Sequence, residues 1–276
     1  MLNKLGITNY ELRIYFLIIF SICSTVECYS QTDTTFTFRT QTNNAFTLGE
    51  KLVFDIDYGF ITAGVATMEI PSIELMNERQ CYIISVRVRS AKGFDWIYTV
   101  RDSYFTFVDT KGIFPWQFEQ HIREGGYRRD FIAEFDQQKH FAKTKVNNDI
   151  EFIKIPEYVH DIVSAFYFCR TIDFSSMKQN DEIQLQNFYG DSTYSLIVKY
   201  FGKEDVDVGA GEFRTLKIQP MIREGGLFKN TGNMMIWLSD DENKIPVKMS
   251  SKIIVGSIVA ELQQYGGIKN QLKAKK

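Results

Sequence analysis

The sequence has little of what most enzymes and metalloproteins use. It contains only three histidines, four cysteines and five prolines in 276 residues. No CxxC pair or Cys/His cluster has the spacing of a structural zinc site, and neither a glycine-rich phosphate loop nor a GxSxG nucleophile motif occurs. We therefore expect no catalytic residues, no metal and no cofactor, and we classify the chain as a non-enzyme.

A strong excess of either charge is also lacking. Lys and Arg total 32 and Asp and Glu total 34, which gives a formal net charge of −2. A protein that attracts nucleic acid through its overall field carries a clear excess of positive charge. We therefore expect no nucleic-acid partner.

A continuous hydrophobic run occurs near the amino terminus. Lys4 and Arg13 precede an apolar stretch at 14–22, and a more polar segment follows at 24–30. This order is typical of a secretory signal peptide. The stretch is too short for a spanning helix, which needs about 20 apolar residues. We expect residues 1–30 to be a cleaved signal peptide, the mature chain to have no transmembrane span, and the protein to be exported to the periplasm or the outer-membrane periphery.

Two cysteines would remain in the mature chain. Cys81 lies in an expected strand and Cys169 in an expected helix. An oxidising compartment would allow them to form a disulfide. Both residues also suit the role of small buried hydrophobic side chains. The sequence leaves these two interpretations open.

The dominant pattern after residue 46 is alternation of apolar and polar side chains. This period is typical of strands with one buried face, and the 14% aromatic content also favours β structure. The expected strands follow one another at short intervals and cover 52–60, 82–88, 116–123, 127–135, 194–200, 213–218, 234–238, 245–249 and 258–262. We predict a mainly β fold in which antiparallel meanders form a barrel or a strongly curved half-barrel.

One segment departs from this pattern. Residues 156–171 begin with Pro156, carry acidic residues early and have Arg170 near the end, as the helix dipole prefers. The stretch 165–169 is apolar on every side, which is typical of a buried helix. We expect one buried helix at about 156–171 that packs against the concave face of the sheet or closes one mouth of the barrel.

The remaining segments set the domain boundaries. We predict a flexible leader at 31–45, a single β-rich domain at 46–265 and a basic, frayed tail at 266–276. The pentapeptide Ile-Arg-Glu-Gly-Gly occurs at 122–126 and again at 222–226. The repetition fits two related meander halves. It also fits independent use of Gly-Gly by two hairpins.

Two groups of side chains imitate reactive sites. His160 and Ser164 would share a helix face, like a nucleophile and its base. No strained elbow accompanies them, so we interpret Asp161 as support for the helix amino end and Ser164 as a small packing residue. Asp240 and Asp241 offer oxygen ligands that suit calcium, but the segment has the composition of an ordinary turn. A hydrolase that uses either group is the least favoured hypothesis.

Several short phrases carry a family resemblance. They are LGEKLVF at 48–54, AGVA at 63–66, VRDSY at 100–104, REG at 123–125, HDIVSAFY at 160–167, GAGEF at 209–213, IWLSDD at 236–241 and IPV at 245–247. With these phrases the chain resembles, over about 46–265, the exported bacterial proteins of the domain-of-unknown-function family 3108. The resemblance implies a largely β envelope protein of Gram-negative type, with no established activity and no catalytic residues to transfer. By architecture alone, the expected fold is also similar to half-barrel periplasmic carriers of lipid or lipoprotein acyl chains.

The inward-facing surface is the remaining candidate for function. A barrel lined by aromatic side chains either packs solid or holds an apolar ligand. We expect a periplasmic binding or carrier protein for an apolar ligand, a lipid or a lipidated partner. The candidate ligand-binding residues are Phe54, Tyr58, Trp116, Phe131, Ile162, Phe166 and Trp237. The alternative is an envelope scaffold that binds another protein or a glycan through its strands or loops.

Overall fold

A computed structural model describes most of the chain. It covers residues 36–147, 149–190, 192–224, 227–229, 234–252 and 256–276. The predicted signal peptide at 1–30 lies outside the described residues. Phe38–Lys276 form one compact unit. Among the described residues, no helix has both the length and the hydropathy that crossing a membrane requires.

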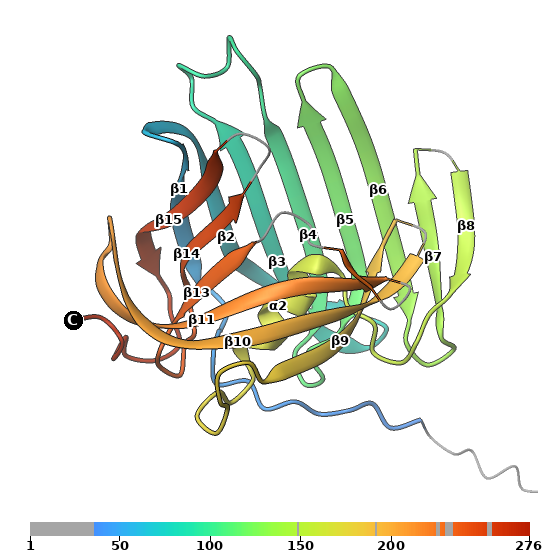
Figure 1. The fold of residues 1–276 in the computed structure, drawn as a ribbon. Coiled ribbons are helices and arrows are strands. Elements are labelled where there is room, and N and C mark those ends of the chain that lie inside the picture. Colours follow the sequence, from blue (N-terminus) through green and yellow to red (C-terminus); the bar gives the residue numbers. More distant parts are fainter. Residues whose placement is uncertain (1–35, 148, 191, 225–226, 230–233, 253–255) are drawn as a thin grey trace, which may run out of the picture. The chain divides into compact units, whose positions relative to one another are not determined.

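Strands make up most of this unit (Figure 1). They are β1 (Lys51–Tyr58), β2 (Ile61–Met76), β3 (Arg79–Ser90), β4 (Arg101–Asp109), β5 (Pro115–Glu124), β6 (Tyr127–Asp136), β7 (Phe141–Val146), β8 (Asp149–Lys154), β9 (Glu182–Tyr189), β10 (Ser192–Val208), β11 (Gly211–Glu224), β12 (Leu227–Lys229), β13 (Met235–Ser239), β14 (Pro246–Lys252) and β15 (Ser257–Gly266). The alternating apolar pattern explains them, because successive side chains of a strand point to opposite faces and only one face meets the core.

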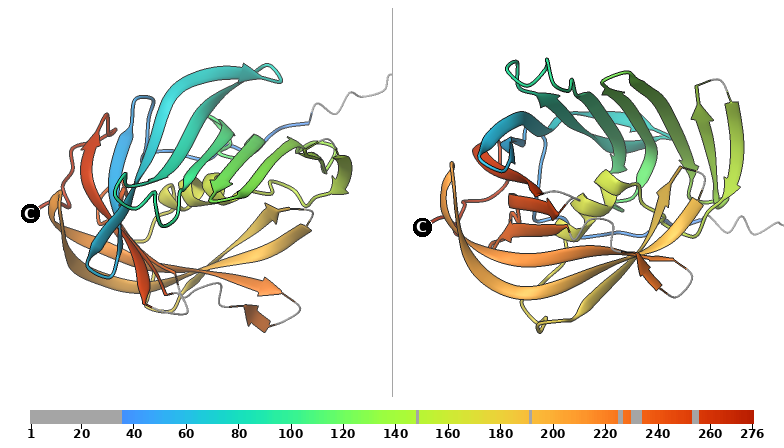
Figure 2. Two further views of the ribbon diagram at one scale, coloured as in Figure 1. Left: turned by 90° about the horizontal axis from the view of Figure 1, so that it is seen from above. Right: turned by 45° about the horizontal axis from the view of Figure 1, so that its top comes forward.

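These strands form one antiparallel sheet. The order of hydrogen-bonded neighbours is β8-β7-β6-β5-β4-β3-β2-β1-β15-β14-β13-β11-β10-β9, with β12 beside β11. β8 and β9 are the two ends of this path, so the described sheet curls without closing (Figure 2). The prediction of a mainly β, strongly curved half-barrel is confirmed. The first strand of the meander is joined to the last one, because β1 pairs with β15 along its whole length.

The two copies of the repeated pentapeptide occupy equivalent positions in the ladder. The first copy ends β5, where Glu124 lies opposite Tyr127 of β6. The second ends β11, where Glu224 lies opposite Leu227 of β12. The described part of each copy therefore ends a strand that pairs with the strand after it. This placement fits both interpretations of the repeat.

The helix α2 (Ile162–Arg170) is shorter than predicted. Asp161 is its N-cap, and the Asp161 carboxylate accepts hydrogen bonds from the backbone N–H groups of Val163 and Ser164. The start moves from Pro156 to Ile162 because Tyr158 has a φ of +52°, which an α-helix cannot accommodate. His160 instead bridges to β9, where its N–H donates to the carbonyl of Gln186 at 2.9 Å. Asp161 thus supports the helix amino end, as predicted.

α2 lies inside the curve of the sheet and divides the core into two clusters (Figure 2). Val163 and Tyr167 pack with the inner face of β1–β7 in the larger cluster. Ala165 and Cys169, on another side of the helix, pack with β9–β11 and β13. The helix is therefore in contact with both arms of the sheet, in agreement with its apolar sequence.

Residues 38–45 correct the prediction of a flexible leader. They form no helix or strand, but Phe38 stacks on Phe114 with 5.5 Å between ring centroids. The Arg39 guanidinium donates hydrogen bonds of 2.8 Å to the carbonyls of Gly112 and Ile113. Ala45 is 1% exposed. Such fixed contacts leave no periodic signal in the sequence, so the polar, Thr-rich composition of this stretch does not reveal them.

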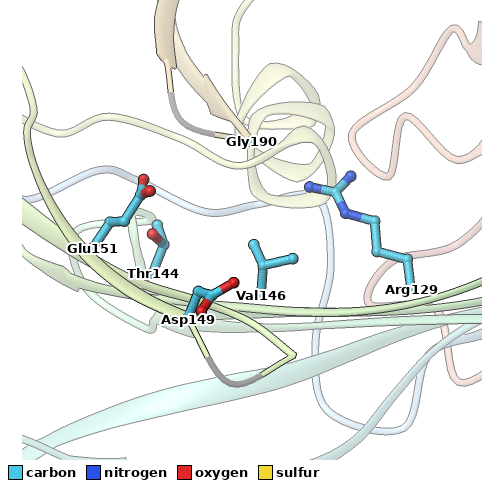
Figure 3. A pocket seen from close by; sticks show the side chains of 6 residues that line it. All are labelled: Arg129, Thr144, Val146, Asp149, Glu151 and Gly190. Atoms are coloured by element: carbon cyan, nitrogen blue, oxygen red, sulfur yellow. The ribbon is translucent and has the colours of Figure 1, made fainter.

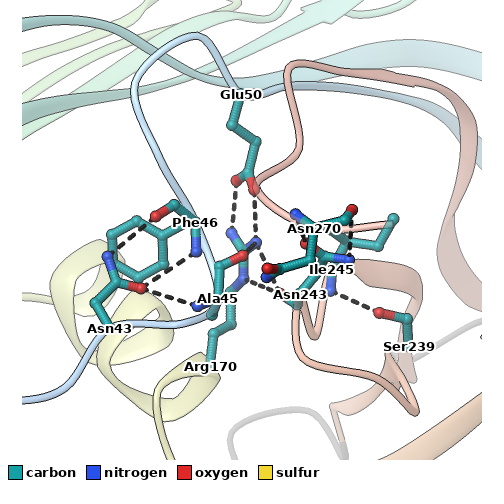
Figure 4. Close-up of polar contacts among 9 residues, drawn as sticks. All are labelled: Asn43, Ala45, Phe46, Glu50, Arg170, Ser239, Asn243, Ile245 and Asn270. Atoms are coloured by element: carbon teal, nitrogen blue, oxygen red, sulfur yellow. Dashed lines mark hydrogen bonds and ion pairs between the residues drawn. The ribbon is translucent and has the colours of Figure 1, made fainter. Parts of the chain in front are cut away.

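The carboxyl-terminal segment corrects the prediction of a frayed tail. The Arg214 N–H donates to the carbonyl of Ala274 at 2.9 Å, and Ala274 is completely buried. The Asn270 N–H donates to the Asn243 side chain at 2.8 Å (Figure 4). The lysines of this tail remain near the surface while its few apolar residues pack inward, a division that net basic composition does not reveal.

A buried ion pair joins the helix, the start of β1 and the β13–β14 turn. Arg170 and Glu50 have fully buried side chains, and two guanidinium nitrogens each donate to a Glu50 carboxylate oxygen at 2.7 Å (Figure 4). The Arg170 guanidinium also donates to the carbonyl of Asn243 at 3.0 Å. This bidentate geometry satisfies both charges and fixes three distant segments to each other.

The two cysteines of the expected mature chain are both free and buried. Burial raises the pKa of each thiol to about 12. Cys81 belongs to a small cluster with Phe114 and Trp116, whereas Cys169 belongs to the cluster between α2 and β9–β13. Of the two interpretations left open by the sequence, the structure supports that of small buried hydrophobic residues.

Candidate ligand-binding surface

The inner face of the sheet changes from fully buried to partly exposed along the strands. On β1, Leu52 and Phe54 are 0% exposed, Ile56 is half-buried and Tyr58 is 38% exposed. We call the fully buried part, which contains α2, the closed half. The part nearer the β1–β2 connection is the open half, and its inward-facing strand residues are Ile56, Val86, Val88, Tyr104, Met249 and Ala260.

The strand register places these residues side by side. Val86 of β3 lies opposite Tyr104 of β4, and Tyr104 lies opposite Gln120 of β5. On the other side of β1, Ile56 is opposite Ala260, and Ala260 is opposite Met249. Cross-strand neighbours on one face lie within contact of one another. The open half is therefore a mainly apolar surface that extends from β14 to β4 and consists of half-buried side chains.

The same face becomes polar towards the β8 edge. Six residues line a pocket of about 330 Å³ there, and they are Arg129, Thr144, Val146, Asp149, Glu151 and Gly190. Arg129 lies on one side of Val146, and the two carboxylates lie on the other (Figure 3). The pocket joins the end of β6, the edge hairpin β7–β8 and the β9–β10 connection, so it lies where the two ends of the sheet approach each other.

Arg129 is the cation of this pocket. Its guanidinium lies 5.2 Å from the ring centroid of Phe131 and 5.9 Å from that of Tyr189, and it donates to the Gln120 side chain at 3.5 Å. Within the described residues it makes no ion pair. A half-buried guanidinium held by aromatic faces keeps donors free for an anionic or strongly polar group.

Tyr104 is the polar side chain of the apolar row. Burial raises the pKa of its phenol to about 12, and the nearby Asp102 carboxylate contributes to this rise. The phenol is therefore protonated at every physiological pH and can donate a hydrogen bond to a ligand oxygen.

Three of the seven predicted ligand-binding residues keep exposed surface: one lies on β1, and two lie on α2 in the closed half. Tyr58 is the last residue of β1, next to the β1–β2 connection. Ile162, which is 54% exposed, begins the helix. Phe166 is half-buried, contacts both core clusters, and shares a helix face with Ile162 because the two are four residues apart.

The other four predicted residues are buried. Phe54 and Phe131 are buried in the larger core cluster, and Trp116 is buried in the small cluster with Phe114 and Cys81. Trp237 faces away from its neighbours Ile236 and Leu238 and is hydrogen-bonded to Glu204, with Lys217 over its ring. The period of two identifies a face but not the depth of a residue along the barrel, so these four were not distinguishable from residues of the open half.

Sequence reasoning missed Val86, Val88, Tyr104 and Arg129 as site residues. Val86 and Val88 were in an expected strand with the correct phase, and so was Arg129. The available signal was the position of each residue relative to the strand end. Inward-facing residues close to the same end of each hairpin share the open half, whereas those in mid-strand lie in the core.

His160 and Ser164 form hydrogen bonds inside the fold. His160 Nδ1 lies 3.3 Å from Ser164 Oγ, and both residues are buried. Ser164 Oγ accepts the Asp161 N–H at 3.0 Å and so completes a capping box. Burial and then the adjacent Arg39 guanidinium lower the pKa of His160 well below its usual value. A neutral imidazole results, whose Nε2 accepts from the guanidinium at 3.1 Å.

The acidic turn after β13 is also structural. Asp241 accepts hydrogen bonds from Ser239 Oγ and the Asn243 N–H, and its second oxygen accepts the Ala274 N–H. Asp240 pairs with Lys203 at 2.8 Å. In the described part of the chain, no three His, Cys, Asp or Glu side chains gather as metal ligands. Asp241 thus connects the turn to the carboxyl-terminal segment.

A family model supplies the identification. The model for the protein family of unknown function DUF3108 matches residues 53–263. The chain belongs to the DUF3108 family. The resemblance found in the sequence phrases is thereby confirmed. No curated protein matches the chain.

One solved structure supports the fold, and two others were matched at lower similarity. A beta-barrel-like protein of the domain of unknown function DUF1849 from Brucella abortus is 10% identical, with a TM-score of 0.53, and the match covers 79% of this chain and 97% of that one. A candidate lipoprotein from Parabacteroides distasonis is 12% identical with a TM-score of 0.33, and the match covers 83% of this chain and 100% of that one. A candidate exported protein with a YmcC-like fold from Bacteroides fragilis is 11% identical with a TM-score of 0.31, with 83% and 100% covered. This DUF3108 chain thus shares a barrel-like fold with the DUF1849 protein.

Proposed function

We propose that this DUF3108 protein binds an amphiphile on its concave face. The apolar part of the ligand would lie on the open half, and its polar part would lie in the pocket beside Arg129. The observation that carries this proposal is the row of half-buried apolar side chains on the same face as a polar pocket. Neighbouring apolar side chains that stay accessible to water often mark a binding site.

The register supports the division of the ligand into two parts. Val86, Tyr104 and Gln120 lie opposite one another on successive strands, and Phe131 and Val146 follow on β6 and β7 beside the pocket. Gln120 and Phe131 are buried, so the apolar and polar parts of the face are separate accessible regions. Asp149 lies opposite Val146 at the end of the row. A purely apolar ligand would leave Arg129 and the carboxylates desolvated without partners, which is costly. A ligand with a polar head satisfies both regions.

We also propose that the protein acts as an exported carrier in the periplasm or at the outer-membrane periphery. The basic, apolar and polar segments of residues 1–30 support export. A carrier in an aqueous compartment needs a surface that shields an acyl chain from water, and the open half offers one.

A fluorescent apolar probe tests the binding surface. N-phenyl-1-naphthylamine should bind the wild type, and Val88→Asp should weaken binding by about tenfold or more, because a carboxylate resists burial against hydrocarbon. Val65→Asp is the matched control. Val65 is also half-buried and lies on the adjacent strand, but it points to the outer face. Equal effects of the two substitutions would contradict the proposal.

The second candidate function is binding of a protein along the edge strand β8. Ile150 and Phe152 on its outer face are 54% and 69% exposed, and β8 has no second neighbour in the described sheet. An open edge with apolar side chains is a suitable template for an added strand. A photo-crosslinking residue at position 152 that captures one recurrent envelope protein, with the same capture in a Val88→Asp background, would favour this candidate.

A further inference from the structure

Three connections at the open end of the half-barrel carry exposed hydrophobic side chains. They are the β1–β2, β3–β4 and β5–β6 connections, and all three point the same way in Figure 1. The exposed fractions run from 48% to 108% for Phe60, Ile61, Trp96, Ile97, Tyr98 and Tyr127. We call these six residues the hydrophobic rim. They differ from the open half, because they lie at the connections and not on the inner face of the strands.

The loops of the rim are fixed to one another. The Ala91 N–H donates to the carbonyl of Ala63 at 2.8 Å, which ties the β3–β4 connection to β2. The Gly125 N–H donates to the carbonyl of Thr99 at 2.8 Å. A Cβ atom at Gly125 would lie 3.1 Å from the Tyr98 ring, so that ring packs directly on the β5–β6 turn. The rim is therefore one surface.

The β3–β4 connection is built to present its side chains outward. Asp95 accepts hydrogen bonds from Ser90 Oγ at 2.5 Å and from the Arg101 guanidinium at 2.6 Å. The Phe94 and Asp95 N–H groups donate to the carbonyl of Ala91 and close a compact turn. This anchoring leaves Trp96, Ile97 and Tyr98 exposed to solvent. Burying these side chains in the fold would be favourable.

Positive charge surrounds the rim. Four exposed basic residues at this end of the strands make no ion pair among the described residues, and they are Arg89, Lys92, Arg128 and Lys252. Among the acidic residues near these connections, Asp95 pairs with Arg101, Asp57 accepts from the Thr62 hydroxyl and Glu124 accepts from the Tyr98 hydroxyl. These four basic residues lie beside the rim although the whole chain has a net charge of −2.

We propose that the hydrophobic rim docks on the surface of an anionic phospholipid bilayer. Trp, Tyr and Phe side chains favour the interfacial region of a membrane, where an apolar ring meets polar headgroups. Lys and Arg beside such residues add attraction to anionic lipids. Phe60, Ile61, Trp96 and Ile97 enter the headgroup region, and the basic residues contact the phosphates. This contact is carried by the loops and does not depend on a ligand on the concave face.

Tryptophan fluorescence provides a direct readout of this contact. Trp96 is 82% exposed, whereas Trp116 and Trp237 are 6% and 9% exposed. Vesicles of phosphatidylcholine with phosphatidylglycerol should shift the emission of the full chain to the blue, and brominated acyl chains should quench it. Trp96→Phe should abolish both changes. Vesicles of phosphatidylcholine alone should bind at least about tenfold more weakly, because the charge attraction is lost.

Matched double substitutions separate the rim from general surface hydrophobicity. Phe60→Ser with Trp96→Ser should lower the vesicle affinity by about tenfold or more. Leu75→Ser with Phe152→Ser is the control, because these residues are 73% and 69% exposed and lie outside the rim. The control pair should bind vesicles as the wild type does. Val88→Asp should also bind vesicles normally, so that loss of ligand binding and loss of vesicle binding can be distinguished. Absence of vesicle binding by the wild type, or equal losses in the two pairs, would overturn the proposal, and a protein captured at the rim instead would do the same.

Discussion

The closed and open halves of the same concave face differ in what their side chains contact. In the closed half, Phe54 and Ile84 are completely buried, and the Arg170–Glu50 pair is satisfied inside the protein. In the open half, Ile56 and Val88 have the same inward direction but keep a water-accessible side. The strands are continuous through both halves. The difference therefore comes from α2, which fills one half and leaves the other for a ligand.

The largest expected contrast concerns two arginines. Arg170→Leu should lower the free energy of unfolding by about 3–5 kcal/mol, because Glu50 would be left as an uncompensated buried charge. Arg129→Leu, in the pocket of the open half, should cost less than about 1 kcal/mol, since it removes no ion pair. Urea denaturation measures both. Adding Glu50→Leu to Arg170→Leu should recover much of the loss, and equal costs for the two arginines would contradict the division into halves.

A smaller contrast is expected for two isoleucines. Ile84→Ala should cost about 2–5 kcal/mol, since it leaves a cavity in a packed cluster. Ile56→Ala should cost less than half as much, because water already reaches Ile56. Thermal and urea unfolding of the two variants provide the comparison. A larger cost at Ile56 would show that the open half is as tightly packed as the closed half.

The closed half should also produce a pH dependence. The folded-state pKa of His160 is lowered well below its usual value by burial and then by Arg39, so the unfolded state binds the proton more readily. Stability is then fully present above about pH 6.5 and falls as the pH falls towards the folded-state pKa, with a slope of up to about 1.4 kcal/mol per pH unit. His160→Gln should flatten this slope between about pH 6.5 and 5.5. An unchanged slope in His160→Gln would show that another group is responsible.

The smallest effect is chemical and leaves stability almost unchanged. Cys81 and Cys169 should react with iodoacetamide in the native protein only through unfolding, because burial raises the pKa of both thiols to about 12. A thiol introduced by Val88→Cys should react about a hundredfold faster, since it faces the open half. Mass spectrometry of the alkylated peptides distinguishes the sites, and protection of the introduced thiol would mean that this surface is closed.

Much of the sheet could be predicted from the sequence. Alternation placed β1, β3, β5, β6, β10, β11 and β13–β15, and the apolar run after His160 placed the helix. The strands β2, β4 and β7–β9 were not assigned, because small and polar side chains interrupt their pattern. β4, for example, contains Ser103 and Thr106 on opposite faces, and Thr106 is buried as a partner of Asp161.

The segments without regular structure could not be predicted, for a different reason. Arg39 is held by Gly112, Ile113 and the Tyr158 hydroxyl, which are all distant in the sequence. Such contacts depend on the completed fold and have no local signature. The candidate site could be predicted only in part. Alternation identified the inner face, but the extent of α2 across that face depends on the completed fold.

Native mass spectrometry of the protein isolated from its own envelope tests the central claim most directly. Our account predicts a non-covalent adduct whose mass and fragments identify an amphiphile with a polar head, and loss of that adduct in Val88→Asp but not in Val65→Asp. A bare polypeptide mass under conditions that preserve other lipid complexes, in both the wild type and the Val65→Asp control, would contradict it.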